Sequence, residues 1–316
     1  MTSKLAIGRF RNLGFRWRSL RFSPIETNLG GKTVVITGVT GGLGKATAKA
    51  LADMGAEVVI VGRSEEKLDR AAAEIGPRAI PTKADLSVMD EVRGLASGLL
   101  GTSDRLDVLI NNVGVLLPER SETAEGLEST FATNVAGQFL VTNLLLPRLT
   151  ESAPGRVVTV SSGGMYAQRL RPDDLETRKS DYTGPKAYAR TKRAQVIITE
   201  EWARRFDPSE VVFHAMHPGW SATPGVADSL PAFNRIMKPL LRTPEQGADT
   251  IVWLAAADEP AEATGGSWFD RSPAPTHLTD STVETEQDRA LLWDSLANIT
   301  QSDAPTRIAK RGPTNG

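Results

Sequence analysis

The sequence contains no cysteine, which excludes disulfide bridges, thiolate metal sites and cysteine nucleophiles. Its three histidines are scattered along the chain, so we predict no metal site: they are His214, His217 and His277. No apolar run reaches the roughly 18 residues of a membrane-spanning helix. The formal net charge of −1 argues against a nucleic-acid binder. With 40% hydrophobic residues among 316, the chain can build a sizeable core, and we predict a globular protein of the cytoplasm.

The first 29 residues form a basic N-terminal arm. Residues 1–21 contain no acid and six cations, which are Lys4, Arg9, Arg11, Arg16, Arg18 and Arg21. These cations are not followed by the apolar run of about 7 to 15 residues that a secretory signal needs, so the arm is not such a signal. Drawn as a helix, it has Phe10, Leu13, Trp17 and Leu20 on one side and Arg11 and Arg18 on the other. One interpretation is a contact with an anionic membrane surface. The alternative is an arm packed over the domain, since Gly8 and Gly14 weaken any helix.

From about residue 30, short β-branched runs alternate with longer amphipathic segments. We predict strands at 33–37, 57–61, 107–111, 156–160, 211–215 and 265–269, and helices at 42–54, 65–75, 88–100, 126–149, 186–206 and 284–299. Continuously apolar strands that alternate with helices indicate a parallel sheet covered on both faces. The predicted fold is therefore α/β: a Rossmann-like, doubly wound, parallel seven-stranded sheet in three layers. We expect this domain over 30–280, a C-terminal helix within 281–299 and a disordered tail over 300–316.

A glycine-rich turn joins the first predicted strand to the first helix. Glycines there allow the backbone to turn sharply and to approach a pyrophosphate without a Cβ clash, and the helix N-terminus offers free N–H groups to the anion. Because the turn lies within a strand–turn–helix unit, we predict dinucleotide binding by Gly38, Thr40, Gly41, Gly42, Leu43 and Gly44. The spacing fits both G-x-x-x-G-x-G and G-x-x-G-x-x-G, so the glycines alone do not separate two branches of one superfamily.

The end of the second strand bears on which dinucleotide binds. An acidic residue there would accept hydrogen bonds from the ribose of NAD and repel a 2′-phosphate. Here the strand runs into Arg63 and Ser64, with no acid before Glu65. The guanidinium of Arg63 suits a phosphate, so we predict NADP(H) as cofactor. The alternative is NAD, with Arg63 solvated and Glu65 or Glu66 turned back to the ribose.

Further motifs, taken with the glycine turn, resemble the short-chain dehydrogenase/reductase family over residues 30–280. They are Asp85-Leu86, Asn111-Asn-Val-Gly114, Asn134, Ser161-Ser162, Tyr188-Ala-Arg-Thr-Lys192 and His217-Pro-Gly219. Within the family, the segments around Ser162, Trp202 and Trp220 resemble the subgroup called dehydrogenase/reductase family member twelve and the retinol-dehydrogenase-like members.

Tyr188 and Lys192 are the candidate catalytic pair. At spacing i, i+4 on a helix they share one face. A free tyrosine with a pKa near 10 is a poor base, and a neighbouring ammonium would lower that pKa. The phenol could then exchange a proton with an alcohol or carbonyl oxygen. Tyr182 also precedes a lysine by four residues, but the intervening Gly184-Pro185 should break the helix.

The resemblance implies roles for the other residues. It gives Ser162 the task of holding the substrate oxygen, Asn134 that of anchoring a water that relays protons, and Lys192 a bond to the nicotinamide ribose. It places Asn112, Val113 and Gly114 beside the adenine and gives Asp85, next to Leu86, a bond to its amine. It also closes Pro218, Gly219 and Trp220 over the nicotinamide, with Thr223 bound to its carboxamide. For the paired asparagines the alternative is a strand-ending turn, and we expect His217 to be structural.

Two segments vary from the family pattern and bear on the substrate. Residues 168–179 lengthen the chain between Ser162 and Tyr188 and should form an excursion at the pocket rim. Residues 222–241 are apolar and rich in proline, which fits either a lid over a lipophilic substrate or plain core packing.

We therefore predict an enzyme that transfers hydride between NADP(H) and a carbonyl or secondary-alcohol substrate. One rival is an epimerase or dehydratase of the extended branch, whose cofactor is unreduced overall. The other is a non-catalytic nucleotide-sensing or membrane-surface protein. Homodimers and homotetramers are usual in the family.

Overall fold

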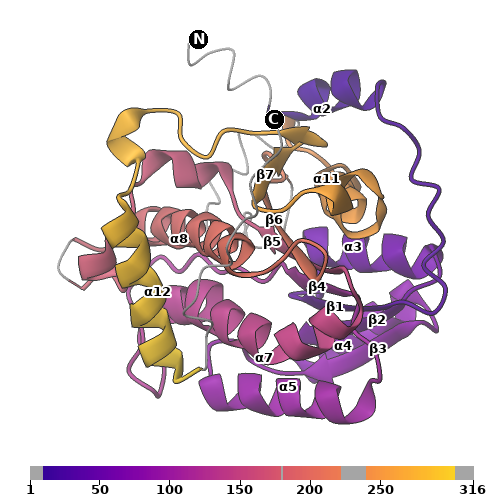
Figure 1. Cartoon of the computed structure of the whole chain (residues 1–316), viewed down its shortest axis with the longest axis horizontal. Coiled ribbons are helices and arrows are strands. Elements are labelled where there is room, and N and C mark those ends of the chain that lie inside the picture. Colours follow the sequence, from indigo (N-terminus) through magenta and orange to yellow (C-terminus); the bar gives the residue numbers. More distant parts are fainter. Residues whose placement is uncertain (1–9, 179–180, 222–239, 303–316) are drawn as a thin grey trace.

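The computed structural model describes residues 10–178, 181–221 and 240–302. Its centre is an eight-stranded sheet of order β3-β2-β1-β4-β5-β6-β7-β8 (Figure 1). The strands are β1 (Thr33–Thr37), β2 (Glu57–Gly62), β3 (Ala79–Lys83), β4 (Val108–Asn111), β5 (Gly155–Val160), β6 (Val211–Met216), β7 (Gly266–Phe269) and β8 (Ser272–Pro273). Seven pair in parallel, and β8 adds a two-residue antiparallel edge to β7. The seven parallel strands and the doubly wound order confirm the predicted fold, to which β8 is a small addition.

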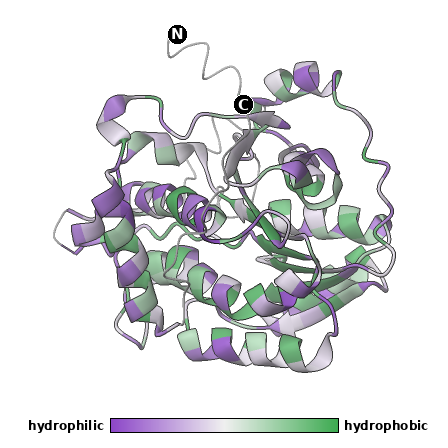
Figure 2. Cartoon of the chain, viewed as in Figure 1, coloured by the Kyte–Doolittle hydropathy of each residue, from purple (hydrophilic) through white to green (hydrophobic). Residues whose placement is uncertain are grey.

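Helices cover both faces of the sheet. One face carries α5 (Met89–Thr102), α7 (Gly137–Glu151) and α8 (Gly184–Arg205), with α12 (Glu286–Thr300) packed outside them. The other carries α3 (Gly42–Asp53), α4 (Glu65–Ile75) and α11 (Pro244–Ala256). The strands between them are apolar on both sides, as Figure 2 shows for the centre of the molecule. Burial on both faces explains their unbroken β-branched runs.

One predicted helix is interrupted. The segment predicted as one helix over 126–149 consists of α6 (Ser129–Phe131), a π-helical turn over Ala132–Ala136 and α7. The carboxylate of Glu128 begins the helix by accepting hydrogen bonds from the backbone N–H groups of Thr130 and Phe131. Single π turns within helices are frequent at functional sites, and this one carries Asn134.

The N-terminal arm packs on the domain through one side of α2 (Asn12–Ser19). Phe15 is buried, and Arg18 forms an ion pair with Asp270 beyond β7. Phe10 lies before the helix and packs against Phe269 with ring centroids 5.3 Å apart, so the prediction that it shares a side with Leu13 is wrong. The arm is therefore anchored at two points beside the last strands.

The sequence predicted an excursion over residues 168–179 and a lid over residues 222–241. The excursion was expected at the pocket rim, but its described part, residues 168–178, contributes nothing to the lining of the large cavity. Asp174 instead pairs with Arg190 of α8, which fastens the excursion to that helix. The proposed lid lies mostly outside the described residues, as do most of the C-terminal tail and residues 1–9. Within the described ranges, no helix is both long and apolar enough to cross a membrane.

Candidate active site

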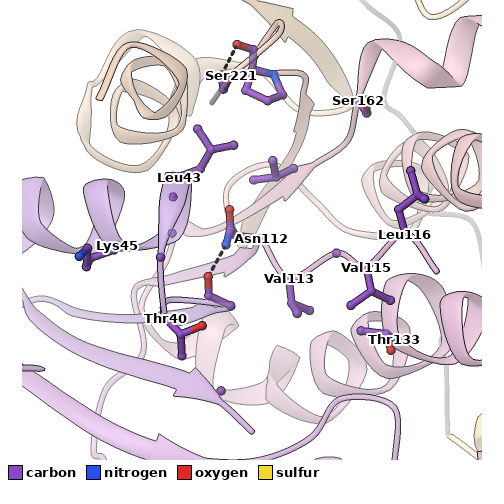
Figure 3. Close-up of a pocket in the computed structure, with 18 of the residues that line it drawn as sticks. Thr40, Leu43, Lys45, Asn112, Val113, Val115, Leu116, Thr133, Ser162 and Ser221 are labelled. Atoms are coloured by element: carbon purple, nitrogen blue, oxygen red, sulfur yellow. Dashed lines mark hydrogen bonds between the residues drawn. The ribbon is translucent and has the colours of Figure 1, made fainter. Parts of the chain in front are cut away.

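A cavity of about 1150 Å³ opens at the carboxyl ends of the central strands. It runs from Arg63 beyond β2, past the glycine turn after β1, to Ser162, Tyr188 and Lys192. The chain order reverses between β1 and β4, and at such a switch point the loops diverge and leave a crevice for a ligand. Figure 3 shows side chains of both neighbouring strand ends converging on this space.

The glycine turn depends on the absence of side chains at two positions. Gly38 has a φ of +77°, which disfavours other residues, and a Cβ there would lie 2.8 Å from the Cα of Val113. A Cβ on Gly44 would overlap the carbonyl oxygen of Gly38 and lie 2.6 Å from the side-chain nitrogen of Asn112. Only glycine therefore permits this close approach of turn and helix, which leaves the N-terminus of α3 facing the cavity. The predicted residues Thr40, Gly41, Gly42 and Leu43 also line it.

Asn112 secures the turn rather than only bordering it. Its side-chain amide donates to the carbonyl oxygens of Thr37 (2.8 Å) and Gly38 (3.0 Å). Figure 3 marks one of these two bonds with a dashed line at Asn112. The hydroxyl of Thr37 in turn accepts hydrogen bonds from the backbone of Asn112 and Val113, each at 3.1 Å. This reciprocal clamp gives the paired asparagines a structural role that the sequence analysis named only as an alternative. Val113 and Gly114 line the cavity, and a Cβ on Gly114 would lie 3.0 Å from the ammonium nitrogen of Lys192.

The far end of the cavity is basic. Arg63 is exposed, lines the cavity with Ser64, and is joined there by Lys67 and Arg70. Arg70 pairs with Glu66 on α4, and both side chains are well exposed. Asp85 and Leu86 border the same end, where the Asp85 carboxylate accepts hydrogen bonds from the backbone N–H and hydroxyl of Ser87. Arg63, Lys67 and Arg70 bring positive charge to this end of the cavity, and no acidic residue stands directly at the end of β2. This end is therefore suitable for a phosphate group.

Tyr188 and Lys192 share the face of α8 that borders the cavity. The ammonium nitrogen of Lys192 lies 5.4 Å from the centre of the Tyr188 ring and donates to the carbonyl oxygen of Val160 at 2.9 Å. Burial lowers the pKa of Lys192 to about 7. Burial also raises the pKa of Tyr188, an effect that its hydrogen bond with Ser162 partly offsets. The structure therefore does not show the expected lowering of the Tyr188 pKa by Lys192, because burial raises that pKa instead.

Ser161 and Ser162 point in different directions from the end of β5. The hydroxyl of Ser161 is buried and donates to the backbone carbonyl of Lys192 at 2.9 Å. Ser162 is half-buried and borders the cavity, as Tyr188 does, and its hydroxyl accepts a hydrogen bond from the backbone N–H of Gly164 at 3.2 Å. Successive strand residues face opposite sides, so the hydroxyl of Ser161 fixes α8 to the sheet, although both serines line the cavity.

Asn134 is held tightly from several directions. Its side chain accepts from the backbone N–H of Val115 at 2.8 Å and donates to the carbonyl oxygen of Val115 and the hydroxyl of Thr191. Its own carbonyl oxygen accepts from Gln195 at 2.7 Å. These bonds tie the loop after β4 to α8, so in this structure Asn134 positions the walls of the cavity. The sequence analysis did not identify Gln195, whose single signal was its place one turn beyond Thr191.

The side chains of the other two tyrosines, Tyr166 and Tyr182, form hydrogen bonds away from Lys192. Helix α8 begins at Gly184, with Pro185 in its first turn, so Tyr182 lies outside the helix and off the face of Lys186, as predicted. The hydroxyl of Tyr182 bonds to Thr130 and Glu128, each at 3.2 Å. Tyr166 donates to the carbonyl oxygen of Pro275 at 2.8 Å.

The segment after β6 forms the remaining wall, and the N-terminal arm supports it. Pro218, Gly219 and Trp220 line the cavity, whereas Thr223 lies outside the described residues. The carbonyl oxygen of Phe10 accepts from the backbone N–H of Trp220 at 3.0 Å. Gly219 has a φ of +71°, and a Cβ there would meet that oxygen at 2.9 Å. His217 is buried and stacks on Phe269 at 4.2 Å, which agrees with the structural role expected for it.

A buried Arg242 completes this support, and the sequence analysis missed it. Its guanidinium donates to the carbonyl oxygen of Pro218 at 3.1 Å and pairs with Asp270 through bonds of 2.6 and 2.9 Å. Asp270 also pairs with Arg18 of the arm. The three charges therefore link the arm, the wall after β6 and the end of β7. A lone arginine in a segment of irregular structure carries no sequence pattern that would reveal such a role.

The cavity beyond Ser162 and Tyr188 has an apolar lining. Leu116, Leu117 and Pro118 contribute from the loop after β4, and Pro185 and Leu241 also line the cavity. Within the described residues, no group of three or more histidines and acids could hold a metal ion.

A doubly wound sheet whose switch-point cavity is bordered by a glycine cradle and a Tyr–Lys pair is typical of dinucleotide-dependent enzymes. The comparisons with known proteins agree. The sequence model of the family described as "short chain dehydrogenase" matches residues 32–232. The chain is 38% identical to "Dehydrogenase/reductase SDR family member 12" of Bos taurus, over 90% of this chain and 92% of that protein.

It is also 33% identical to "Retinol dehydrogenase 13" of Homo sapiens, over 90% of this chain and 88% of that protein. Among solved structures, an uncharacterized protein of Mycobacterium paratuberculosis matches with a TM-score of 0.72 and 30% identity, covering 87% of this chain and 96% of that one. The chain belongs to the short-chain dehydrogenase/reductase family and is an NAD(P)-dependent oxidoreductase that acts on alcohol and carbonyl groups.

Proposed function

We propose that this enzyme interconverts a lipophilic ketone or aldehyde and the corresponding alcohol, with NADP(H) as the hydride carrier. The observation that carries the proposal is one continuous cavity, basic at one end and apolar at the other, with Tyr188, Lys192 and Ser162 between them. A dinucleotide and a hydrophobic substrate together fit such a space, and their reacting ends would meet at the phenol.

Observations of the structure support the fit of NADP(H). The cradle at Gly44 and the N-terminus of α3 would hold the pyrophosphate, and Asp85 the adenine amine. Arg63, with Lys67 and Arg70 beside it, would bind the 2′-phosphate that distinguishes NADP from NAD. Pro218, Gly219 and Trp220 would cover the nicotinamide end. When bound, the nicotinamide supplies or accepts the hydride at the reacting carbon.

The chain's own residues would handle the proton. In the reducing direction the protonated phenol of Tyr188 donates its proton to the substrate carbonyl oxygen, which becomes the alcohol oxygen. The hydroxyl of Ser162, which lines the same part of the cavity as Tyr188, would hold that oxygen in place. Lys192 lies beside the ring and can return a proton to the phenolate, since its pKa of about 7 lets it both release and regain one near neutrality. Hydrogen bonds of Asn134 to Val115 and to Thr191 hold the loop after β4 and helix α8 in place around Tyr188 and Lys192.

The apolar wall favours a lipophilic substrate. Leu116, Leu117 and Leu241 offer no charge to a polar substrate, and desolvating polar groups against them would be unfavourable. The name of the relative "Retinol dehydrogenase 13" also favours a lipophilic substrate, because retinol is a hydrophobic alcohol.

The test is to follow NADPH absorbance with a panel of ketones, aldehydes, sterols and retinoids, and to measure product in parallel. We expect one NADPH oxidised for each alcohol formed with at least one hydrophobic carbonyl. Conversion of a substrate without net NADPH oxidation would instead identify an epimerase or dehydratase. Binding of NADPH without turnover of any compound in the panel would favour the nucleotide-sensing alternative.

A further inference from the structure

The outer side of the N-terminal helix α2 exposes three large apolar side chains. Leu13 is 79% exposed, Trp17 62% and Leu20 83%. At about 100° per residue, positions 13, 17 and 20 fall within roughly 60° of one another, so they form one stripe along the helix. We call this the α2 stripe. Clustered apolar side chains at a surface are unfavourable in water and mark a site of contact.

The orientation of α2 is fixed by its inner side, so the α2 stripe is held facing outward. Phe15 is buried against the domain and packs on Phe22, with ring centroids 5.9 Å apart. Arg18 is tied to Asp270, and the side chain of Asn12 accepts a hydrogen bond from Gln246 of α11. Figure 1 shows α2 at the periphery of the molecule. Rotation of the helix to bury the stripe would break these contacts.

Cations flank the α2 stripe. Arg16 and Arg21 are exposed: Arg16 lies about 40° beyond one edge of the stripe on the helical projection, and Arg21 follows two residues after the end of α2. The guanidinium of Arg21 lies 4.8 Å from the centre of the Trp17 ring. The first 21 residues of the sequence carry six cations and no acid. An apolar stripe that contains a tryptophan and is flanked by Arg16 and Arg21 matches the boundary between anionic headgroups and acyl chains.

We propose that α2 docks this protein on the surface of an anionic lipid bilayer, with the α2 stripe in the headgroup boundary and Arg16 and Arg21 among the lipid phosphates. A second copy of the chain is the less suitable occupant. Three side chains cover far less than the roughly 800 Å² that each partner of a stable protein interface buries. The cations of the arm would also repel their counterparts in another copy. The proposal is independent of the enzymatic reaction, because docking needs neither nucleotide nor substrate.

The structure also places the docked helix beside the active site. Phe10 lies two residues before α2, and its carbonyl oxygen accepts a hydrogen bond from the backbone N–H of Trp220, which lines the large cavity. A hydrophobic molecule dissolved in the bilayer would therefore lie near one wall of that cavity.

The test is co-sedimentation of the full-length protein with vesicles of phosphatidylcholine alone and of phosphatidylcholine with about 30% phosphatidylserine. We expect binding to the anionic vesicles that weakens as salt is raised. The variant Leu13→Ser/Trp17→Ser/Leu20→Ser should bind on the order of a hundredfold less tightly. The variant Arg16→Gln/Arg21→Gln should bind about tenfold less tightly and lose most of the salt dependence.

The matched control removes three other exposed apolar side chains, as Leu278→Ser/Val283→Ser/Leu291→Ser, and should bind as the unchanged protein does. Thermal unfolding of every variant establishes that each is folded. Brominated lipids should quench fluorescence of the unchanged protein more than that of Trp17→Phe. Equal binding by the α2 and control variants, or no binding to anionic vesicles, would overturn the proposal. So would a dimer, seen by sedimentation velocity without lipid, that the α2 variant alone abolishes.

Discussion

The ammonium of Lys192 donates to the carbonyl oxygen of Val160 at 2.9 Å, from a side chain that is only 2% exposed. A single carbonyl oxygen does not replace the water that an ammonium loses on burial, so the charged form is disfavoured and the pKa falls to about 7. The fold therefore holds this lysine at a cost in stability, as is common for groups that serve a reaction.

Replacement of the lysine by an apolar residue of similar length should stabilise the protein. Lys192→Met is expected to raise the free energy of unfolding by roughly 5 kcal/mol at or below pH 7, where the native protein must keep the buried amine charged although burial has lowered its pKa from 10.5 to about 7. Between pH 7 and about 10.5 the unfolded chain binds this proton and the native protein does not, so the stability of the unchanged protein rises with pH. The advantage of the variant should shrink over that interval. Urea unfolding at several pH values measures it, and a pH-independent difference would contradict the burial of a titrating amine.

The glycine cradle predicts a contrast between two Gly→Ala substitutions. Gly44→Ala should weaken NADPH binding at least about tenfold and reduce stability by about 1–3 kcal/mol, because the new methyl group overlaps Gly38 and Asn112. Gly94→Ala, in helix α5 with no atom within 4 Å of the added Cβ, should leave NADPH affinity unchanged and stabilise by about 0.5–1 kcal/mol. Fluorescence titration and urea unfolding test both. Equal affinities in the two variants would show that the nucleotide binds elsewhere.

Arg63 should set the preference between the two nucleotides. Arg63→Ser is expected to lower kcat/KM for NADPH about tenfold or more while leaving that for NADH nearly unchanged, since only NADPH carries a 2′-phosphate. Arg78→Ser removes another exposed arginine, outside the cavity lining, and should change neither value. A parallel loss with both nucleotides after Arg63→Ser would mean that this arginine does not recognise the phosphate.

The Arg18–Asp270–Arg242 group should be important for stability. Asp270→Asn keeps the side-chain shape but leaves two arginines without their counter-charge, so we expect a loss of about 3 kcal/mol and weaker NADPH binding through the displaced Pro218 wall. Asp249→Asn is the control: it disrupts a similar pair, with Arg271, whose side chains are more exposed, and should cost about 1 kcal/mol or less. Chemical denaturation compares them, and losses of equal size would argue against a special role for the buried group.

The sequence predicted those parts of the molecule that local patterns determine. The strands β1, β2, β4, β5 and β6 are continuously apolar because both faces are buried, and Tyr188 and Lys192 are brought together by helical spacing alone. By contrast, β3 was missed because it lies at the sheet edge, is largely exposed and contains Pro81. Helix α11 was missed although Thr243 and Gln246 form a capping box at its start.

The contacts that hold the site together could not be predicted in the same way. The clamp between Asn112 and Thr37 and the group that joins Arg18 to Arg242 connect residues far apart in the chain, and only the tertiary fold brings them together. The pKa values of Tyr188 and Lys192 likewise depend on burial, which helical spacing does not reveal.

The most direct test of the proposed chemistry is the turnover of Tyr188→Phe with NADPH and a carbonyl substrate. The variant keeps the ring and loses only the hydroxyl that would donate the proton. We predict that kcat falls by about a hundredfold or more while the affinity for NADPH stays within about twofold. A variant that retains the kcat of the unchanged enzyme would contradict Tyr188 as the proton donor, and with it the account of this site.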